Sequence, residues 1–272
     1  MSTRWNRYTV AMNKRAKPVK VRGGGGDEVV AGPGVLGKRG GQPRLRSMPD
    51  QIAERIYEDI VAGTYAPGER IREEELAELF GVSRGPIREA LRILEKDSVV
   101  RLSQNRGASV TELSLKEVNE IFLIRQLLAG AMIRSLEGRG PGFIAQFDER
   151  VAQLEALAAT PDSHSAYVAA TVALALDLAD ASGNERLAQF LLSLARQSSR
   201  YTQLALTTPQ RRKESARNWR SVVKALAANR MSDASLAMEK LIDDARREAV
   251  RALESGETAS RRSGTSRQAT SK

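Results

Sequence analysis

Residues 83–96, SRGPIREALRILEK, decide the fold of the first part of the chain. At about 3.6 residues per helical turn, one side of a helix over this stretch is apolar and carries Ile87, Leu91 and Leu94. Another side repeats a basic residue at every fourth position and carries Arg84, Arg88, Arg92 and Lys96. The stretch therefore predicts a helix that buries one side and presents a cationic stripe on another.

A second, shorter helix is predicted immediately before it. Residues 73–82, EEELAELFGV, place leucines and a phenylalanine at helical spacing, and Gly81 ends the pattern. Ser83 suits the N-cap of the basic helix, and Pro86 is tolerated in its first turn because that amide has no intrahelical partner. Two short helices joined by a glycine-containing turn, with the basic side on the second, predict a helix-turn-helix.

The flanking residues extend this pair into a winged helix. Isoleucine repeats at every fourth residue before it, at Ile52, Ile56 and Ile60. Gly63 ends that helix. After the pair, residues 99–103 and 108–111 alternate between apolar and polar side chains around a QNRG turn, which predicts a β-hairpin. Three helices followed by a hairpin predict a winged helix-turn-helix domain over residues 47–112.

Residues 50–112 resemble the N-terminal DNA-binding domain of the GntR family of transcription regulators. The likeness rests on the segments PGERI, ELAELFGVSR, PIREALRIL and RGASV, which occur in the same order and spacing. One departure is Ser98, where the family usually has a glycine after the recognition helix. The resemblance implies that the basic helix lies in the major groove of DNA.

The resemblance assigns DNA contacts to Ser83, Arg84, Arg88, Arg92, Arg106 and Gly107. Arg84 and Arg88 lie in the first turns of the recognition helix, where a guanidinium can bind guanine O6 and N7. Ser83 and Arg92 would contact phosphates. Arg106 and Gly107, at the tip of the wing, would enter the minor groove.

A run of charges on a helix is often only a solvated surface, which is the alternative interpretation for each arginine. In similar family members an arginine of the preceding helix also contacts DNA, but here that position holds Glu74, to which we assign no such role.

Residues 113–254 predict an all-helical antiparallel bundle. A capping-box pattern begins at Ser114, and turn residues such as Gly183 and Pro209 separate amphipathic segments. The six predicted helices span residues 115–136, 142–159, 163–182, 184–207, 210–229 and 233–254. This half is similar to the FCD domain of the FadR-like branch of the GntR family, which implies an effector-binding and dimerisation domain.

Many FCD domains hold a divalent metal through one Asp and three His, but this chain does not keep that set. The corresponding positions hold Thr171, Ala175, Trp219 and Asp244. The single histidine of the chain, His164, matches none of them. Because imidazole is the main ligand in such sites, we predict no bound metal and no cofactor.

The altered metal positions leave two interpretations of the predicted effector pocket. In the first, Trp219 lines the pocket and Arg125 binds an acid or polar group, since without a metal an anion needs arginine or amide donors. In the second, Trp219 fills the former metal cavity and Arg125 pairs with an acid of the bundle. The family's usual acid four residues after this arginine is replaced by Ala129.

The net charge of +10 belongs to the ends of the chain. Residues 1–46 hold eleven Lys and Arg against two acids, and residues 255–272 hold four against one. Both are poor in large apolar residues, which predicts disordered basic tails. The chain has no cysteine, no apolar run approaching about 18 residues and no apolar secretory leader, so we expect a cytoplasmic protein without a membrane span.

These features predict a sequence-specific DNA-binding transcription regulator, with repression the commonest action in the family. It would bind a palindromic operator as a homodimer and change its operator affinity when a small-molecule effector, such as an organic acid, binds the bundle. The alternative is a ligand-independent DNA-binding regulator or architectural protein that has lost small-molecule sensing. An enzyme is not expected, because the sequence offers no cysteine, no placed histidine, no glycine-rich phosphate loop and no paired carboxylates.

Overall fold

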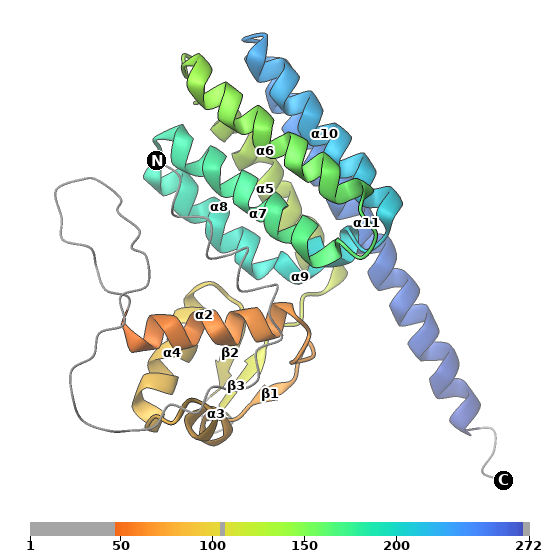
Figure 1. The fold of residues 1–272 in the computed structure, drawn as a ribbon. Coiled ribbons are helices and arrows are strands. Elements are labelled where there is room, and N and C mark those ends of the chain that lie inside the picture. The colour runs from red at the N-terminus through yellow and green to blue at the C-terminus, as the bar shows by residue number, and fades with distance from the viewer. Residues whose placement is uncertain (1–46, 104–106, 269–272) are drawn as a thin grey trace. The chain divides into compact units, whose positions relative to one another are not determined.

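The computed structural model describes residues 47–103 and 107–268 of the 272-residue chain, with side chains described as far as residue 255. The chain forms two compact units, and the boundary between them lies between Glu112 and Leu113 (Figure 1). The predicted tail over residues 1–46 and the predicted DNA contact Arg106 lie outside the described residues.

The first unit is the predicted winged helix-turn-helix. Its elements are α2 (Met48–Val61), β1 (Arg70–Ile71), α3 (Glu73–Phe80), α4 (Arg84–Lys96), β2 (Val100–Ser103) and β3 (Gly107–Val110). α2 begins at a capping box, in which Ser47 and Asp50 satisfy each other's backbone amides. Gly81 ends α3 in a left-handed conformation with φ 66°, which a glycine adopts without strain and which turns the chain toward α4.

The wing is a three-stranded antiparallel sheet in the order β1-β3-β2. β2 and β3 form the predicted hairpin, in which Ser103 lies opposite Gly107 and Val100 lies opposite Val110. β1 was not predicted, because two residues are too few to show an alternating pattern. It lies next to β3 with Arg70 opposite Ser109, and so it brings basic residues to the edge of the wing.

The two turns around α4 differ in how they match the prediction. Ser83 occupies the N-cap position, as predicted, but its side chain makes no capping hydrogen bond. Ser98 follows α4 with φ 54°, a left-handed conformation that favours glycine. This backbone conformation is a physical reason for the glycine that similar proteins carry at that position.

The second unit contains seven helices within the described residues. They are α5 (Leu115–Arg134), α6 (Pro141–Ala159), α7 (His164–Ser182), α8 (Glu185–Gln197), α9 (Ser199–Ala205), α10 (Pro209–Ala227) and α11 (Met231–Gln268). Figure 1 shows most of them packed side by side as a bundle, which confirms the predicted all-helical class.

The segment predicted as one helix over residues 184–207 is in fact two helices. The break falls at Ser198, which is fully buried. Its hydroxyl donates a hydrogen bond of 2.6 Å to the carbonyl of Leu194 and accepts one of 2.9 Å from Arg125. A serine that binds the preceding turn tends to bend a helix, and the contact with Arg125 comes from a distant helix, so periodicity alone could not reveal the break.

α11 also differs from its predicted extent. The helix continues to Gln268, beyond residue 254, where the helical domain was predicted to end. The apolar pattern stops at Leu253, which set the predicted boundary, but no proline interrupts the backbone hydrogen bonds after it.

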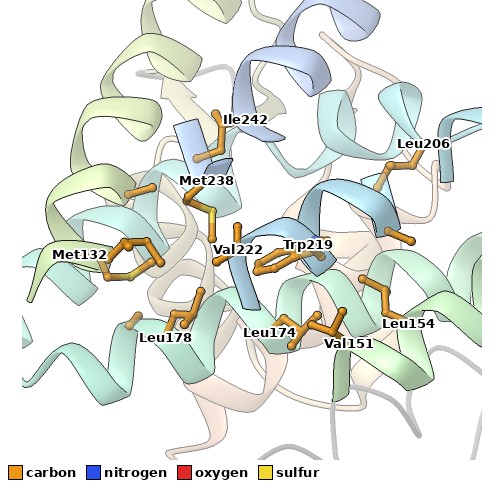
Figure 2. Close-up of a cluster of buried hydrophobic side chains, with 14 of the residues drawn as sticks. Met132, Val151, Leu154, Leu174, Leu178, Leu206, Trp219, Val222, Met238 and Ile242 are labelled. Carbon is orange, nitrogen blue, oxygen red and sulfur yellow. The ribbon is translucent and has the colours of Figure 1, made fainter. Parts of the chain in front are cut away.

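The core of the second unit is built from large apolar side chains of several helices. Figure 2 shows the indole of Trp219 among Val151, Leu154 and Leu174, which come from α6 and α7. α7 is long and apolar enough to cross a membrane by composition alone. Its Leu174 and Leu178 are buried in this core, which explains the apolar composition without a membrane.

Candidate functional site

The basic stripe of α4 lies on the exposed side of a well-anchored helix. Ile87 and Leu91 are fully buried, so the helix cannot rotate without exposing apolar surface. The side chains of Arg84 and Arg88 are 56% and 58% exposed, and Arg92 is exposed as well. The predicted division of α4 into an apolar side and a basic side is therefore confirmed.

Both leading arginines of this stripe have acidic partners on α3, which sequence analysis missed. Arg84 Nη1 lies 2.9 Å from Glu74 Oε1. Arg88 Nε donates a hydrogen bond of 2.7 Å to Glu73 Oε2. The EEE run at the start of α3 was the available signal, but only the angle between the two helices brings it to the basic side of α4.

A groove of about 510 Å³ lies beside this stripe. Its lining includes Gly107 and the polar side chains of Arg70, Arg72, Glu73, Glu74, Arg88, Arg92 and Ser103. Arg70 and Arg72 were not predicted as site residues, because the sequence places them before α3 and only the pairing of β1 with β3 brings them to the wing. Four guanidinium groups around one groove suit phosphate oxygens, and exposed arginines in the first turns of α4 suit guanine edges.

Gly107 begins the returning strand of the wing with φ 77°. A Cβ atom at this position would lie 3.6 Å from the carbonyl oxygen of Ile71 and close to Arg70. The left-handed backbone and this neighbourhood favour glycine, which agrees with the predicted place of Gly107 at the tip of the wing.

The two residues predicted to form an effector pocket have different neighbours. Arg125 donates hydrogen bonds to the hydroxyls of Ser198, at 2.9 Å, and Thr202, at 3.2 Å, and its guanidinium lies 4.8 Å above the ring centre of Phe122. Trp219 is 1% exposed and meets Phe147 edge to face, with the ring centres 6.1 Å apart. Arg125 therefore joins α5 to the α8–α9 break, whereas Trp219 belongs to the apolar core.

Buried donors lie on the same side of α10 as Trp219. Arg212, two turns earlier, is 3% exposed and donates to the carbonyls of Leu206 and Thr207. Its Nε and the indole Nε1 of Trp219 have no hydrogen-bond partner among the described residues.

Burial raises the pKa of Tyr167, on α7, to about 12, against smaller opposing effects of Ser215 and Thr171, so its hydroxyl stays neutral. Sequence analysis missed this set, because an arginine is rarely expected in a core.

The family metal positions do not fit a metal here. Thr171 donates its hydroxyl to the backbone of Tyr167, and Ala175 is exposed. Asp244 accepts hydrogen bonds from Asn218 and Lys240. The lone histidine, His164, has Nε2 at 3.1 Å from the carbonyl oxygen of Gln203. Within the part of the chain that the structure describes, no group of three or more His, Cys, Asp or Glu residues could hold a metal ion.

Protein purified without chelator is therefore expected to contain well under one equivalent of any divalent metal by elemental analysis. The reason is that only one carboxylate remains at the family positions, and Lys240 and Asn218 already occupy it. As a control, Asp244→Asn should leave the metal content unchanged. A full equivalent that a chelator removes with a fall in melting temperature would contradict the prediction.

Comparisons with known proteins agree on both halves of the chain. The profile of bacterial regulatory proteins of the gntR family matches residues 49–110, and the FCD domain profile matches residues 120–244. The chain is 49% identical over 75 residues to the HTH-type transcriptional regulator YdhC of Bacillus subtilis. The matched segment covers 28% of this chain and 34% of the relative. It is 38% identical over 104 residues to the gluconate operon transcriptional repressor of Bacillus licheniformis, which covers 38% of this chain and 40% of that repressor.

Solved structures agree in fold. McbR/YncC of E. coli superposes with a TM-score of 0.64 at 20% identity, over 73% of this chain and 95% of that one. A GntR regulator from Rhodococcus sp. RHA1 gives a TM-score of 0.61 at 20% identity, over 74% and 97% of the two chains. This chain matches the curated relatives over no more than about two fifths of their length, so the similarity identifies the type of domain and not the function of the whole protein. The chain carries the DNA-binding domain of the GntR family of bacterial regulatory proteins, followed by an FCD domain.

Proposed function

We propose that this protein is a sequence-specific DNA-binding transcription regulator, and that it acts as a repressor. The observation that carries the proposal is the exposed arginine stripe of α4, held over the buried Ile87 and Leu91 in a winged helix of the GntR type. Curated relatives with the same DNA-binding domain are named repressors, which supports repression here. Because it acts on DNA, we place the protein in the cytoplasm.

We further propose that the protein acts as a homodimer on a palindromic operator. The support is a set of exposed apolar side chains on α5 and α8, called here the apolar patch: Leu123, Ile124, Leu127 and Phe190. α5 and α8 pack against each other. Large apolar side chains gathered on neighbouring helices are typical of an interface, and a second copy of the chain is the partner that a two-fold operator requires.

The effector proposal is that a small organic acid binds the FCD domain and changes operator affinity. Nε1 of Trp219 and Nε of Arg212, which have no hydrogen-bond partner among the described residues, support a ligand with hydrogen-bond acceptors, and Arg125 is the cation that we predicted for it. The ligand must bind one arrangement of the dimer better than another, since only differential affinity shifts the equilibrium. The full burial of Trp219 favours the alternative, a regulator without small-molecule sensing. A ligand-dependent rise in melting temperature would separate the two.

Arg88→Ala is expected to weaken operator binding by about 1–3 kcal/mol and to relax the preference at one base pair, because a bidentate arginine–guanine pair carries that discrimination. The operator would first be selected from random duplexes, and affinities then measured by fluorescence anisotropy. Arg230→Ala is the matched control, since Arg230 is also exposed and ion-paired but lies in the second unit. Equal operator affinity of Arg88→Ala and the control would remove Arg88 from base readout.

A further inference from the structure

The ion pairs between α3 and α4 join the two helices of the helix-turn-helix through the residues that should read DNA. Glu73 and Glu74 are neighbours in sequence, yet each meets a different arginine, Arg88 and Arg84. Both pairs lie at the face where phosphates and base edges would arrive, and both glutamates line the groove beside the stripe.

These pairs are poorly suited to a role in stability. The two arginine side chains are more than half exposed, and exposed ion pairs contribute little to folding because water and salt screen them. A carboxylate at a DNA-binding face also repels phosphate. We therefore expect these two carboxylates to act in DNA binding.

Glu73 is placed to position Arg88. Its side chain is only 21% exposed, so its carboxylate is held by the surrounding protein. The hydrogen bond uses Nε of Arg88, and the described residues offer the two terminal nitrogens of this guanidinium no other partner. Those two nitrogens form the end of the fork that can bind O6 and N7 of a guanine together.

Glu74 stands in a different relation to Arg84. Its side chain is 61% exposed, and it contacts a terminal nitrogen, Nη1, at 2.9 Å. A terminal nitrogen is an atom that DNA would need, so DNA must displace Glu74 before Arg84 can bind end-on. Every duplex offers phosphate oxygens, but only the operator also places guanine O6 and N7 at Arg84, so the operator offsets the displacement more fully than random DNA does.

We propose that Glu73 is a positioning residue for Arg88 and that Glu74 masks Arg84 from non-specific DNA, so that the two together raise the ratio of operator to non-specific affinity. The inference rests on the proposed function, since it concerns the same DNA-binding surface. Glu74 would then weaken binding to non-specific DNA, whereas an arginine at this position would strengthen it.

Glu74→Gln is expected to raise affinity for a random-sequence duplex by about three- to tenfold and to steepen its logarithmic salt dependence by about 0.9, the slope for one more phosphate contact. Affinity for the operator should rise less, so the specificity ratio falls. Glu78→Gln is the matched control, because Glu78 is also exposed on α3 and has no ion pair with any of the described residues.

Glu73→Gln is expected to reduce discrimination between the operator and its variant at the base pair read by Arg88 by about tenfold, part of what a bidentate contact provides. In an Arg88→Ala background the same change should have no further effect on this discrimination, which a double-mutant cycle measures. Glu73→Asp, with a carboxylate, should recover part of the loss.

The outcomes separate the two claims. If Glu74→Gln changes random-duplex affinity and salt slope no more than Glu78→Gln does, the masking role is wrong. If Glu73→Gln keeps full discrimination, or loses it equally with and without Arg88, the positioning role is wrong. If the unaltered protein prefers no duplex over random DNA, the proposed function itself fails, whatever the glutamate variants do.

Discussion

Leu127→Glu is expected to convert the protein into monomers and to weaken binding to a palindromic operator by roughly a hundred- to ten-thousandfold, the range that linking two binding modules provides. Leu127 is 61% exposed in the apolar patch on α5. A second copy of the chain would cover this patch, and a carboxylate there would lose its water without gaining a cation. The two winged helices would then bind their half-sites independently.

The measurement is light scattering after size-exclusion chromatography, paired with anisotropy on a full operator and on a single half-site. Ala145→Glu on α6 is the control, since it adds the same charge at another exposed position of the second unit. Half-site affinity should be equal in both variants. A Leu127→Glu protein that remains dimeric would place the dimer contact elsewhere.

Trp219→Ala is expected to lower the free energy of unfolding of the second unit by about 3–5 kcal/mol, the usual cost of removing a large aromatic side chain from a core. The indole is almost completely buried and is surrounded by side chains of α6 and α7, as Figure 2 shows. Its edge-to-face contact with Phe147 would also be lost. The remaining cavity adds to the lost burial because a packed core relaxes only in part.

Denaturant unfolding, followed by circular dichroism for the unaltered protein and both variants, measures this change. Trp219→Phe should cost less, since it keeps an aromatic ring and loses only part of the indole's volume, together with an Nε1 that has no partner among the described residues. A loss below about 1 kcal/mol in Trp219→Ala would mean that the side chain borders open space. That result would favour an effector pocket at Trp219 over a filled cavity.

Local pattern was sufficient for the DNA-binding half because each signal there acts over one or two turns. Ile87 and Leu91 repeat at helical spacing, Gly81 supplies the left-handed turn, and the arginines fall on the opposite side. A helix of this kind has only one way to bury its apolar side, so burial of the core and exposure of the stripe follow together. The same periodicity also predicted the helical class of the second half.

Contacts between segments that are distant in sequence could not be predicted from local pattern. The break at Ser198 depends on a hydrogen bond from Arg125, which lies 73 positions earlier. The strand β1 exists only because β3 returns beside it. In both cases the deciding energy comes from a partner that sequence spacing does not identify.

By itself, the sequence determined a winged helix with an arginine stripe, followed by a helical domain without the family's metal ligands, because amphipathic spacing, turn residues and side-chain chemistry are local properties. Only the tertiary structure decided that Glu73 and Glu74 pair with Arg88 and Arg84 and that Trp219 fills a core. These facts depend on how helices cross, and the crossing is set by packing of whole helix surfaces against one another.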